Sequence, residues 1–314
     1  MTSTVRLTVV HNPKAGNGSA LADLERWIAS AGHVGDVIDA DDASALADAL
    51  RDPGDLLAVA GGDGSVRLLA QRLLAAGLQV PLAILPAGTA NNIATSHGIS
   101  RDYEGLVHGW SRGRRVPLDV GRVRAPWGES VWIEACGFGA IARTVGALTP
   151  VPSAPDGDTA DELIRDLEVT RELLVDHPLH ECRLSIDGEI LTGEYCIVEV
   201  MNIPSIGANL TLAAGASAAD GLFDVVVVDQ EARVLLRDYL SARLDGDEAP
   251  DLDLPARRAR RVEVSWDGSR IHVDDEIQPD EESAATGRYW GPDQPLTIEI
   301  EVMPAALTLL VPGD

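Results

Sequence analysis

Residues 61–65 (GGDGS) form the most informative short motif of the chain. They follow the apolar run LLAVA, which predicts a strand, and precede VRLLAQRLL, which has helical spacing. Glycines at such a turn allow positive φ and let a ligand approach the backbone amides, and the start of a helix attracts anions. Because Asp63 would repel a phosphate unless a cation lay between them, the motif indicates a phosphate bound together with a metal ion.

Two further loops carry residue types that suit phosphate binding. Residues 12–18 (NPKAGNG) offer exposed amides and Lys14 to phosphate oxygens. In residues 85–94 (LPAGTANNIA), Gly88 leaves clearance, and Thr89 and Asn91 have side chains that can bond a phosphate or a ribose. Both side chains can equally cap the start of a helix, so the two roles remain open at this point.

The first third of the chain contains the elements that must position these loops. Apolar runs predict strands at residues 5–13, 34–40, 56–61 and 81–86, and helical spacing predicts helices at residues 19–32, 43–52 and 66–77. This alternation predicts a parallel sheet. Because the three loops each follow a strand, we expect them to gather at the carboxyl edge of that sheet.

Beyond residue 119 the pattern changes to strands separated by turn residues. Strands are predicted at residues 131–141, 181–191, 193–203, 222–230, 261–268, 270–277 and 296–304. Helices are predicted at residues 160–178 and 232–244, the first with a core face made of Leu163, Ile164, Leu167, Leu173 and Leu174. This half is therefore predicted to be mainly antiparallel β.

Charge is distributed unevenly along the 314 residues, whose net charge is −25. Residues 1–125 hold 13 acidic and 12 basic residues, whereas residues 126–314 hold 37 and 13. Such a surface excludes nucleic acid as a partner, since phosphate neutralisation needs clustered basic residues.

The amino terminus reads as a strand and not as a signal peptide, and no run is long enough to span a membrane. Cys136, Cys182 and Cys196 are too widely spaced for a zinc set, so we expect buried thiols in a cytoplasmic protein.

Seven motifs together resemble the diacylglycerol kinase catalytic-domain family, which includes bacterial lipid kinases and sphingosine kinases. They occur in the family's order over nearly the whole chain: NPKAGNG, GGDGS, LPAGTANNIA, PLDVGRV (117–123), ACGFGA (135–140), ADGLFDVVVV (219–228) and VDDE (273–276). The nucleotide domain of this family is similar to that of NAD kinases and phosphofructokinases. A single GGDG would be weak evidence, but seven ordered matches are specific.

The resemblance implies a two-domain kinase. An α/β ATP-binding domain (residues 1–125, with 303–314 returning to it) would precede a β-sandwich-like substrate domain (residues 126–302). The implied activity is ATP- and Mg²⁺-dependent phosphorylation of the hydroxyl of diacylglycerol or a similar lipid alcohol, in phospholipid biosynthesis. Alternatives are a kinase of a soluble hydroxyl substrate and a nucleotide- or lipid-binding protein with little catalysis. The resemblance is compatible with a homodimer and with a cytoplasmic protein that contacts the membrane transiently.

The resemblance also implies which residues hold the metal ions and the nucleotide. Asp63 would be catalytic and would hold metal, with Asp119 completing the cluster unless it only caps a turn. Asp220 and Leu222 would hold a structural Mg²⁺, or else form one more Asp-Gly turn before a strand. ATP would contact Asn12, Pro13, Lys14, Ala15, Gly16, Gly61, Gly62, Asp63, Gly64, Ser65, Arg67, Gly88, Thr89 and Asn91.

Two Asp-X-Glu motifs in the second half could supply the catalytic base. Residues 187–189 (DGE) look like a hairpin turn, since Asp-Gly is a favoured hairpin pair. Residues 274–276 (DDE) match the family's Asp-Gly-Glu by their place, so the resemblance favours Asp274 and Glu276 and leaves open which accepts the proton. The sequence departs from the family at Asn92 and Asp275, where the family has Asp and Gly, and at Ser65, where it has Thr.

Overall fold

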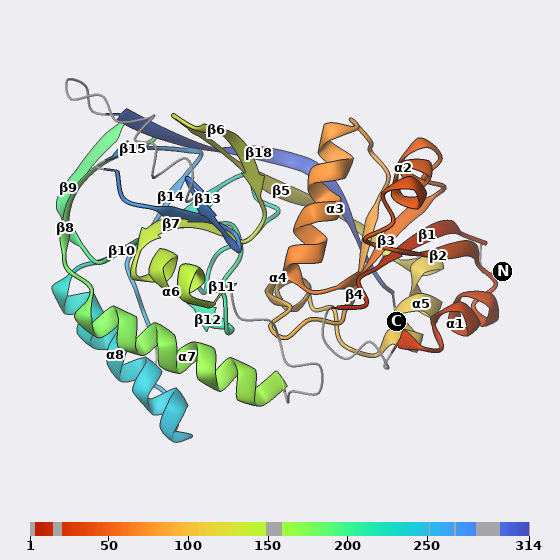
Figure 1. The fold of residues 1–314 in the computed structure, drawn as a ribbon, viewed down its shortest axis with the longest axis horizontal. Helices are drawn as coiled ribbons and strands as arrows, with labels where there is room; N and C mark the ends of the chain where they lie inside the picture. The colour runs from red at the N-terminus through yellow and green to blue at the C-terminus, as the bar shows by residue number, and fades with distance from the viewer. Residues whose placement is uncertain are drawn as a thin grey trace. The chain divides into compact units, whose positions relative to one another are not determined.

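The computed structural model describes residues 4–14, 21–148, 159–250, 252–266, 268–280 and 296–313. The chain divides into two compact units (Figure 1). Unit 1 comprises residues 1–118, 153–159 and 305–314, and unit 2 comprises residues 119–152 and 160–304.

Unit 1 is built on the predicted parallel sheet. Its strands β1 (Arg6–His11), β2 (Val34–Asp39), β3 (Leu56–Gly61) and β4 (Leu82–Pro86) lie in the order β2-β1-β3-β4. Every residue of β3 and β4 is buried, as expected for central strands whose two faces are both covered. The carboxyl ends of β1, β3 and β4 therefore lie at one edge of the sheet, each continued by one of the three predicted loops.

The helices of unit 1 follow the strands in alternation. They are α1 (Leu24–Ser30), α2 (Ala43–Arg51), α3 (Asp63–Ala75), α4 (Asn92–Ser96) and α5 (Tyr103–Gly109), followed by a 3₁₀ turn at Trp110–Arg112. Asp42 caps α2 by accepting hydrogen bonds from the N–H groups of Ser44 and Ala45, and Asp102 caps α5 through Gly105. Helix α3 buries Val66, Leu69 and Leu73.

The C-terminal strand β18 (Leu296–Val311) belongs to both units. From Ala305 onward it lies in unit 1, where Leu309 pairs in parallel with Leu82 of β4. The predicted return of the C-terminal segment is therefore confirmed. Its first part pairs antiparallel with β15 (Arg261–Trp266) in unit 2, with Val262 opposite Ile300.

Unit 2 is a sandwich of antiparallel sheets. One sheet has the order β14 (Ala256–Ala259), β13 (Phe223–Val228), β10 (Ile197–Met201), β7 (Ala135–Gly139), β16 (Ile271–Val273) and β17 (Glu276–Gln278). The other contains β18 and β15 with β8 (His180–Ile186) and β9 (Glu189–Tyr195), and β5 (Arg114–Ala125) pairs with β18 and β6 (Gly128–Trp132). A short hairpin joins β11 (Ser205–Ile206) and β12 (Leu210–Thr211).

The core of the sandwich contains side chains from both sheets. Trp132 and Phe223 are fully buried and stack with ring centroids 4.7 Å apart. Val198 and Val225 of one sheet join Val262 of the other in the same cluster. All three cysteines are buried free thiols, as predicted.

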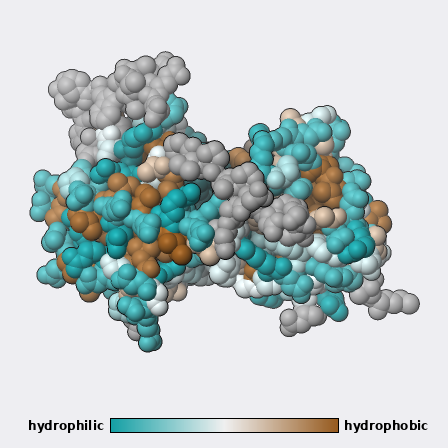
Figure 2. All heavy atoms as spheres, turned by 60° about the horizontal axis from the view of Figure 1, so that its bottom comes forward, coloured by the Kyte–Doolittle hydropathy of each residue, from teal (hydrophilic) through white to brown (hydrophobic). Residues whose placement is uncertain are grey.

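Three helices cover a second apolar cluster in unit 2: α6 (Ala140–Leu148), α7 (Thr159–Asp176) and α8 (Gln230–Asp245). The predicted strand at residues 131–141 was wrong at its end, where helix α6 begins. Strand β7 ends at Gly139, whose φ of +95° breaks the strand. The predicted core face of α7 was wrong at Ile164, which is 47% exposed, because the buried stripe runs through Leu167, Thr170 and Leu174. Figure 2 shows such exposed apolar residues interspersed with hydrophilic ones on the visible face.

Candidate active site

Gly62 of the GGDGS motif packs closely against Gly88 of the third loop. The motif lies where β3 ends at Gly61 and α3 begins at Asp63, as predicted. None of its glycines has positive φ, nor does Gly88, so that part of the prediction was wrong. Instead, a Cβ atom on Gly88 would lie 2.4 Å from the Cα atom of Gly62, which no ordinary contact allows. The backbones of the second and third loops therefore touch.

This contact predicts the effect of adding one methyl group. We expect Gly88→Ala to lower the free energy of unfolding by about 1–3 kcal/mol, because the new Cβ overpacks against the backbone of Gly62. Gly215 is the matched control, since a Cβ there meets nothing within 4 Å and Gly215→Ala should be neutral or slightly stabilising. Denaturant titration of both variants measures the difference. Equal stabilities would show that the two loops do not pack in this way.

Asp63 connects the second loop to the start of α4. Its two carboxylate oxygens accept hydrogen bonds from the backbone N–H groups of Asn92 and Ile93, each at 3.0 Å. The N-cap residue of α4 is Asn91, whose side chain makes no capping bond, so Asp63 caps the helix from a distant part of the sequence. The half-buried carboxylate is thus stabilised by two backbone donors and by the positive end of a short helix.

Asn91 holds the third loop together. Its Oδ1 accepts from the N–H of Gly88 at 2.9 Å, and its Nδ2 donates to the carbonyl of Gly88 at 2.6 Å. Arg101 donates to the same carbonyl and to that of Thr89. Asn91 has a φ of 56°, so the residue also makes the left-handed turn that leads into α4. Contact of ATP with Asn91 and Thr89 stays a prediction, and the amide of Asn91 already has a structural role.

The first loop is tied to the second by a side-chain contact. Nδ2 of Asn12 donates to Oγ of Ser65 at 3.0 Å, and the Oδ1 of Asn12 accepts from the backbone N–H of Lys14. The Nζ of Lys14 pairs with Asp41 at 2.6 Å, with both side chains largely exposed. A cavity of about 140 Å³ borders Asn12, Asp41 and Ser65. Of the other residues predicted to contact ATP, Pro13 is exposed, Arg67 lies buried on α3, and Ala15 and Gly16 fall outside the described residues.

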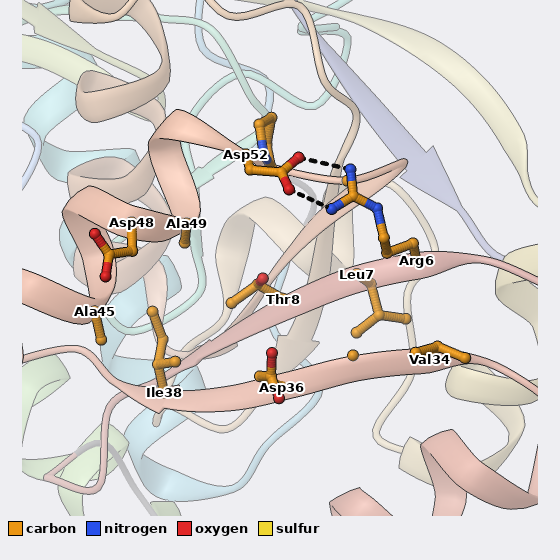
Figure 3. Close-up of a pocket in the computed structure, with 13 residues that line it drawn as sticks. Arg6, Leu7, Thr8, Val34, Asp36, Ile38, Ala45, Asp48, Ala49 and Asp52 are labelled. Carbon is orange, nitrogen blue, oxygen red and sulfur yellow. Dashed lines mark hydrogen bonds and ion pairs between the residues drawn. The ribbon is translucent and has the colours of Figure 1, made fainter.

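A larger cavity in unit 1, of about 430 Å³, lies away from these loops (Figure 3). It is bounded by α2, β1 and β2, and Arg6 forms two hydrogen bonds with Asp52 at its margin. Arg6 is the first residue of β1, and Asp52 follows α2. Ligands of open α/β sheets bind at the carboxyl ends of the strands, and this margin lies at the opposite end. The small cavity beside Asn12 is therefore the better candidate for a nucleotide.

In unit 2, both Asp-X-Glu motifs form two-residue hairpin turns. Asp187 links β8 to β9, as predicted for residues 187–189, and Asp274 links β16 to β17. Both Asp residues have positive φ, of 48° and 52°. In each case the carboxylate accepts backbone hydrogen bonds from a neighbouring segment. Asp187 accepts from the N–H groups of Arg260 and Arg261, and Asp274 from those of Ile133, Glu134 and Ala135.

The three acidic residues of the second motif differ sharply in exposure. Asp274 is 5% exposed, and its carboxylate is surrounded by the three backbone donors at 2.8–3.2 Å. Asp275 and Glu276 are exposed, and Glu276 is the first residue of β17. An acceptor hydroxyl can approach the exposed carboxylates, whereas Asp274 fixes the shape of the hairpin that presents them.

A buried acid–base pair contacts this hairpin, and it was not predicted from the sequence. Nε2 of His272 lies 2.8 Å from Oε2 of Glu199, and Nδ1 lies 2.9 Å from the carbonyl oxygen of Asp274. Both side chains are fully buried. Burial would lower the pKa of His272, but the Glu199 carboxylate outweighs it, so the pKa is raised and the pair retains a proton. The available signal was a glutamate inside the apolar run CIVEVM of a central strand.

The predicted metal ligands of unit 2 lie together at one loop. Asp119 is 1% exposed, its carboxylate accepts from the N–H of Gly221 at 2.7 Å, and its own N–H donates to Ala218. The Asp220 carboxylate accepts from the N–H of Leu222 and pairs with Arg258. Arg258 is thus already paired with the carboxylate that would have to bind a metal ion. The described residues contain no group of three or more acidic, His or Cys side chains placed to hold a metal ion.

The metal roles of Asp63, Asp119, Asp220 and Leu222 therefore stay predictions. The geometry of residues 218–222 is that of an Asp-Gly turn, with Gly221 at a φ of 74°, which was the alternative interpretation. A magnesium ion beside Asp63 would add to the two backbone donors that the carboxylate already has.

Comparison with known proteins identifies two family domains in the chain. The diacylglycerol kinase catalytic domain matches residues 6–123, and the YegS C-terminal NAD kinase beta sandwich-like domain matches residues 166–311. These matches confirm the resemblance to the diacylglycerol kinase catalytic-domain family that the seven motifs predicted. Kinase chemistry is thus the activity class that its relatives carry.

Individual relatives match over two thirds of the chain or more. A diacylglycerol kinase of Mycobacterium tuberculosis (strain ATCC 25618 / H37Rv) is 28% identical over 98% of this chain and 95% of its own length. One from Bacillus subtilis (strain 168) is 25% identical over 67% of each chain. The crystal structure of a diacylglycerol kinase from Bacillus anthracis str. Sterne aligns with a TM-score of 0.70 at 19% identity, covering 99% of this chain and 98% of that one. This last likeness shows that the fold is shared. Among the described helices, none has the length and apolar character that a membrane span needs.

Proposed function

We propose that this protein is an ATP-dependent lipid kinase that phosphorylates the hydroxyl of diacylglycerol or a similar lipid alcohol. One observation carries the proposal: the contacts of unit 1 join all three predicted phosphate loops at the carboxyl edge of the sheet. Asn12 bonds Ser65, Gly62 packs on Gly88, and Asp63 bonds the start of α4. Loops joined in this way present several backbone amides to one anion.

The nucleotide would bind through this chain's own donors. Lys14 is held by Asp41 through an exposed ion pair, and such pairs are weak enough for ATP phosphates to displace the carboxylate. Mg²⁺, when bound with ATP, would neutralise charge on the phosphate oxygens. Asp63 would orient this cation while its backbone hydrogen bonds fix the rotamer of the carboxylate.

The acceptor hydroxyl would lose its proton to Glu276. This carboxylate is exposed at the start of β17, where a substrate can reach it, whereas Asp274 already accepts hydrogen bonds from three backbone N–H groups. We therefore assign Glu276 as the general base and Asp274 as the residue that positions the hairpin.

Two measurements test the proposal. Calorimetry should detect ATP binding in the presence of Mg²⁺, and its absence in folded protein would exclude a kinase. Radiolabelled ATP, offered separately to a total lipid extract and to soluble metabolites, should label a lipid. Label found only in a soluble product would replace the proposal by its alternative, a kinase of a soluble hydroxyl compound, which the acidity of residues 126–314 favours.

The same acidity predicts how activity depends on the lipid surface. We expect slower turnover on anionic vesicles than on neutral micelles at low salt, because 37 acidic residues against 13 basic ones in residues 126–314 repel anionic head groups. Added salt should narrow the difference through screening. Rates of product formation on both surfaces, measured over a salt series, provide the test. Equal rates at low salt would mean that the acidic residues lie away from the lipid surface.

A further inference from the structure

Unit 2 contains a cavity whose polar lining is cationic although this half of the chain is strongly acidic. Its volume is about 420 Å³, within the range typical of small-molecule sites. No Asp or Glu is among the described residues that line it. Its walls come from helices α6 and α7, strands β7, β8 and β17, and nearby turns. They contribute an apolar part, which includes Phe138 and Ile277, and four cationic or ionisable side chains: Arg143, His177, His180 and Arg270.

His177 is the most informative of these side chains. It is 6% exposed, and neither of its ring nitrogens has a hydrogen-bond partner among the described residues. Buried polar groups in folded proteins are nearly always hydrogen-bonded, so a buried imidazole that lines a cavity with both nitrogens unpartnered points to a ligand. The ring of His180 lies close by, with the centroids 5.3 Å apart.

The charged groups that shift the pKa of His177 are all cationic. Burial lowers its pKa to about 4, and the charges of His180, Arg143 and Arg233 act in the same direction. At neutral pH the imidazole is therefore uncharged, and any anion that entered the cavity would be attracted by the arginines around it. Such an anion would also favour protonation of His177, which would then donate a charged hydrogen bond.

We propose that this cavity binds the phosphate group of a ligand. Arginine and histidine together suit a phosphate because the guanidinium fork matches two of its oxygens and the imidazole supplies a further donor. The apolar side of the cavity, with Phe138 and Ile277, suits a phosphate that is attached to carbon chains. Ile277 directly follows Glu276, so the ligand would lie beside the hairpin that carries the proposed base.

The phosphate could be part of a phospholipid head group or could be free in solution. In the first case the acceptor would be a phosphorylated lipid alcohol and not diacylglycerol itself, a consequence that rests on the proposed kinase function. In the second it would be an effector site. Phosphate binding itself does not depend on either outcome, because no nucleotide or turnover is involved.

The test is a calorimetric titration of the full chain without ATP. One arm uses inorganic phosphate, and the other uses neutral detergent micelles that contain phosphatidate, with the detergent alone as blank. We expect binding in at least one arm, and the arm that binds identifies the source of the phosphate. Arg143→Gln should weaken that binding about tenfold, and Arg143→Glu should abolish it.

Arg143 is exposed, so its variants should fold, which melting curves can verify. The matched control is Arg237→Gln on α8, an exposed arginine that pairs with Asp238 outside the cavity and should leave the affinity unchanged. Binding in neither arm would overturn the proposal. So would binding that Arg143→Glu leaves intact, because the phosphate would then lie elsewhere, for example at the nucleotide loops.

Discussion

Glu276→Gln should lower kcat by at least about 100-fold, the low end of general acid–base contributions, and should leave the thermal stability unchanged. The amide is nearly isosteric with the carboxylate but cannot accept the hydroxyl proton. Because Glu276 is exposed at the start of β17, its replacement leaves the apolar core unchanged. Steady-state rates with labelled ATP and the identified acceptor, together with melting curves, measure both effects.

Asp274→Asn should mainly lower the stability of the protein and should affect kcat only indirectly. Its carboxylate accepts from three backbone N–H groups, so the amide would place a donor against a donor and lower the free energy of unfolding by about 1–3 kcal/mol. Any loss of kcat would follow from a displaced hairpin. Asp187→Asn is the matched control, because Asp187 also accepts backbone hydrogen bonds in a hairpin turn, from Arg260 and Arg261, and its replacement should leave kcat unchanged. If Asp274→Asn abolishes turnover at full stability while Glu276→Gln stays active, the two roles are reversed.

Asp63→Asn should lower kcat by about 100- to 1000-fold, as expected when one electrostatic contact to the reacting charge is removed. The substitution removes the negative charge that would orient the cation on the phosphates. It also replaces one of the two oxygens that cap α4, which should cost about 1 kcal/mol of stability. Titrating Mg²⁺ at saturating ATP should show a weaker metal dependence in the variant.

Asp42→Asn is the control for that substitution. Asp42 caps α2 through one oxygen, Oδ1, which accepts from the N–H groups of Ser44 and Ala45. Because Asn keeps this oxygen and caps a helix about as well as Asp, Asp42→Asn should leave both stability and kcat nearly unchanged. An Asp63→Asn variant that behaved like Asp42→Asn would mean that Asp63 is only a capping residue.

The parallel sheet and the antiparallel strands of the second half could be predicted from the sequence because both depend on local pattern, whereas the sandwich was implied by the resemblance that the seven motifs carry. Residues 56–61 are uniformly apolar, as a central strand must be, and Asp187-Gly188 is a turn by composition. The place of GGDGS between β3 and α3 follows from the change of period around it.

What could not be predicted depends on contacts between distant segments. Residue 62 is a glycine because the backbone of Gly88 packs against it. The carboxylate of Asp274 is held by backbone N–H donors at residues 133–135. His177 lies near the end of the predicted helix at residues 160–178, and only the fold brings Arg143 and His180 close to it. Helix α6 was missed because ACGFGAI continues the apolar run of a strand past Gly139.

The long strand β18 has a consequence for how the chain folds during synthesis. Leu309 is the partner of Leu82, and almost all of unit 2 is translated between them. Strand β4 therefore emerges from the ribosome long before the strand that covers its edge. Such a high contact order delays completion of the first sheet until β18 has been translated. Until then β4 presents an unpaired apolar edge, which makes the nascent chain a candidate client for chaperones.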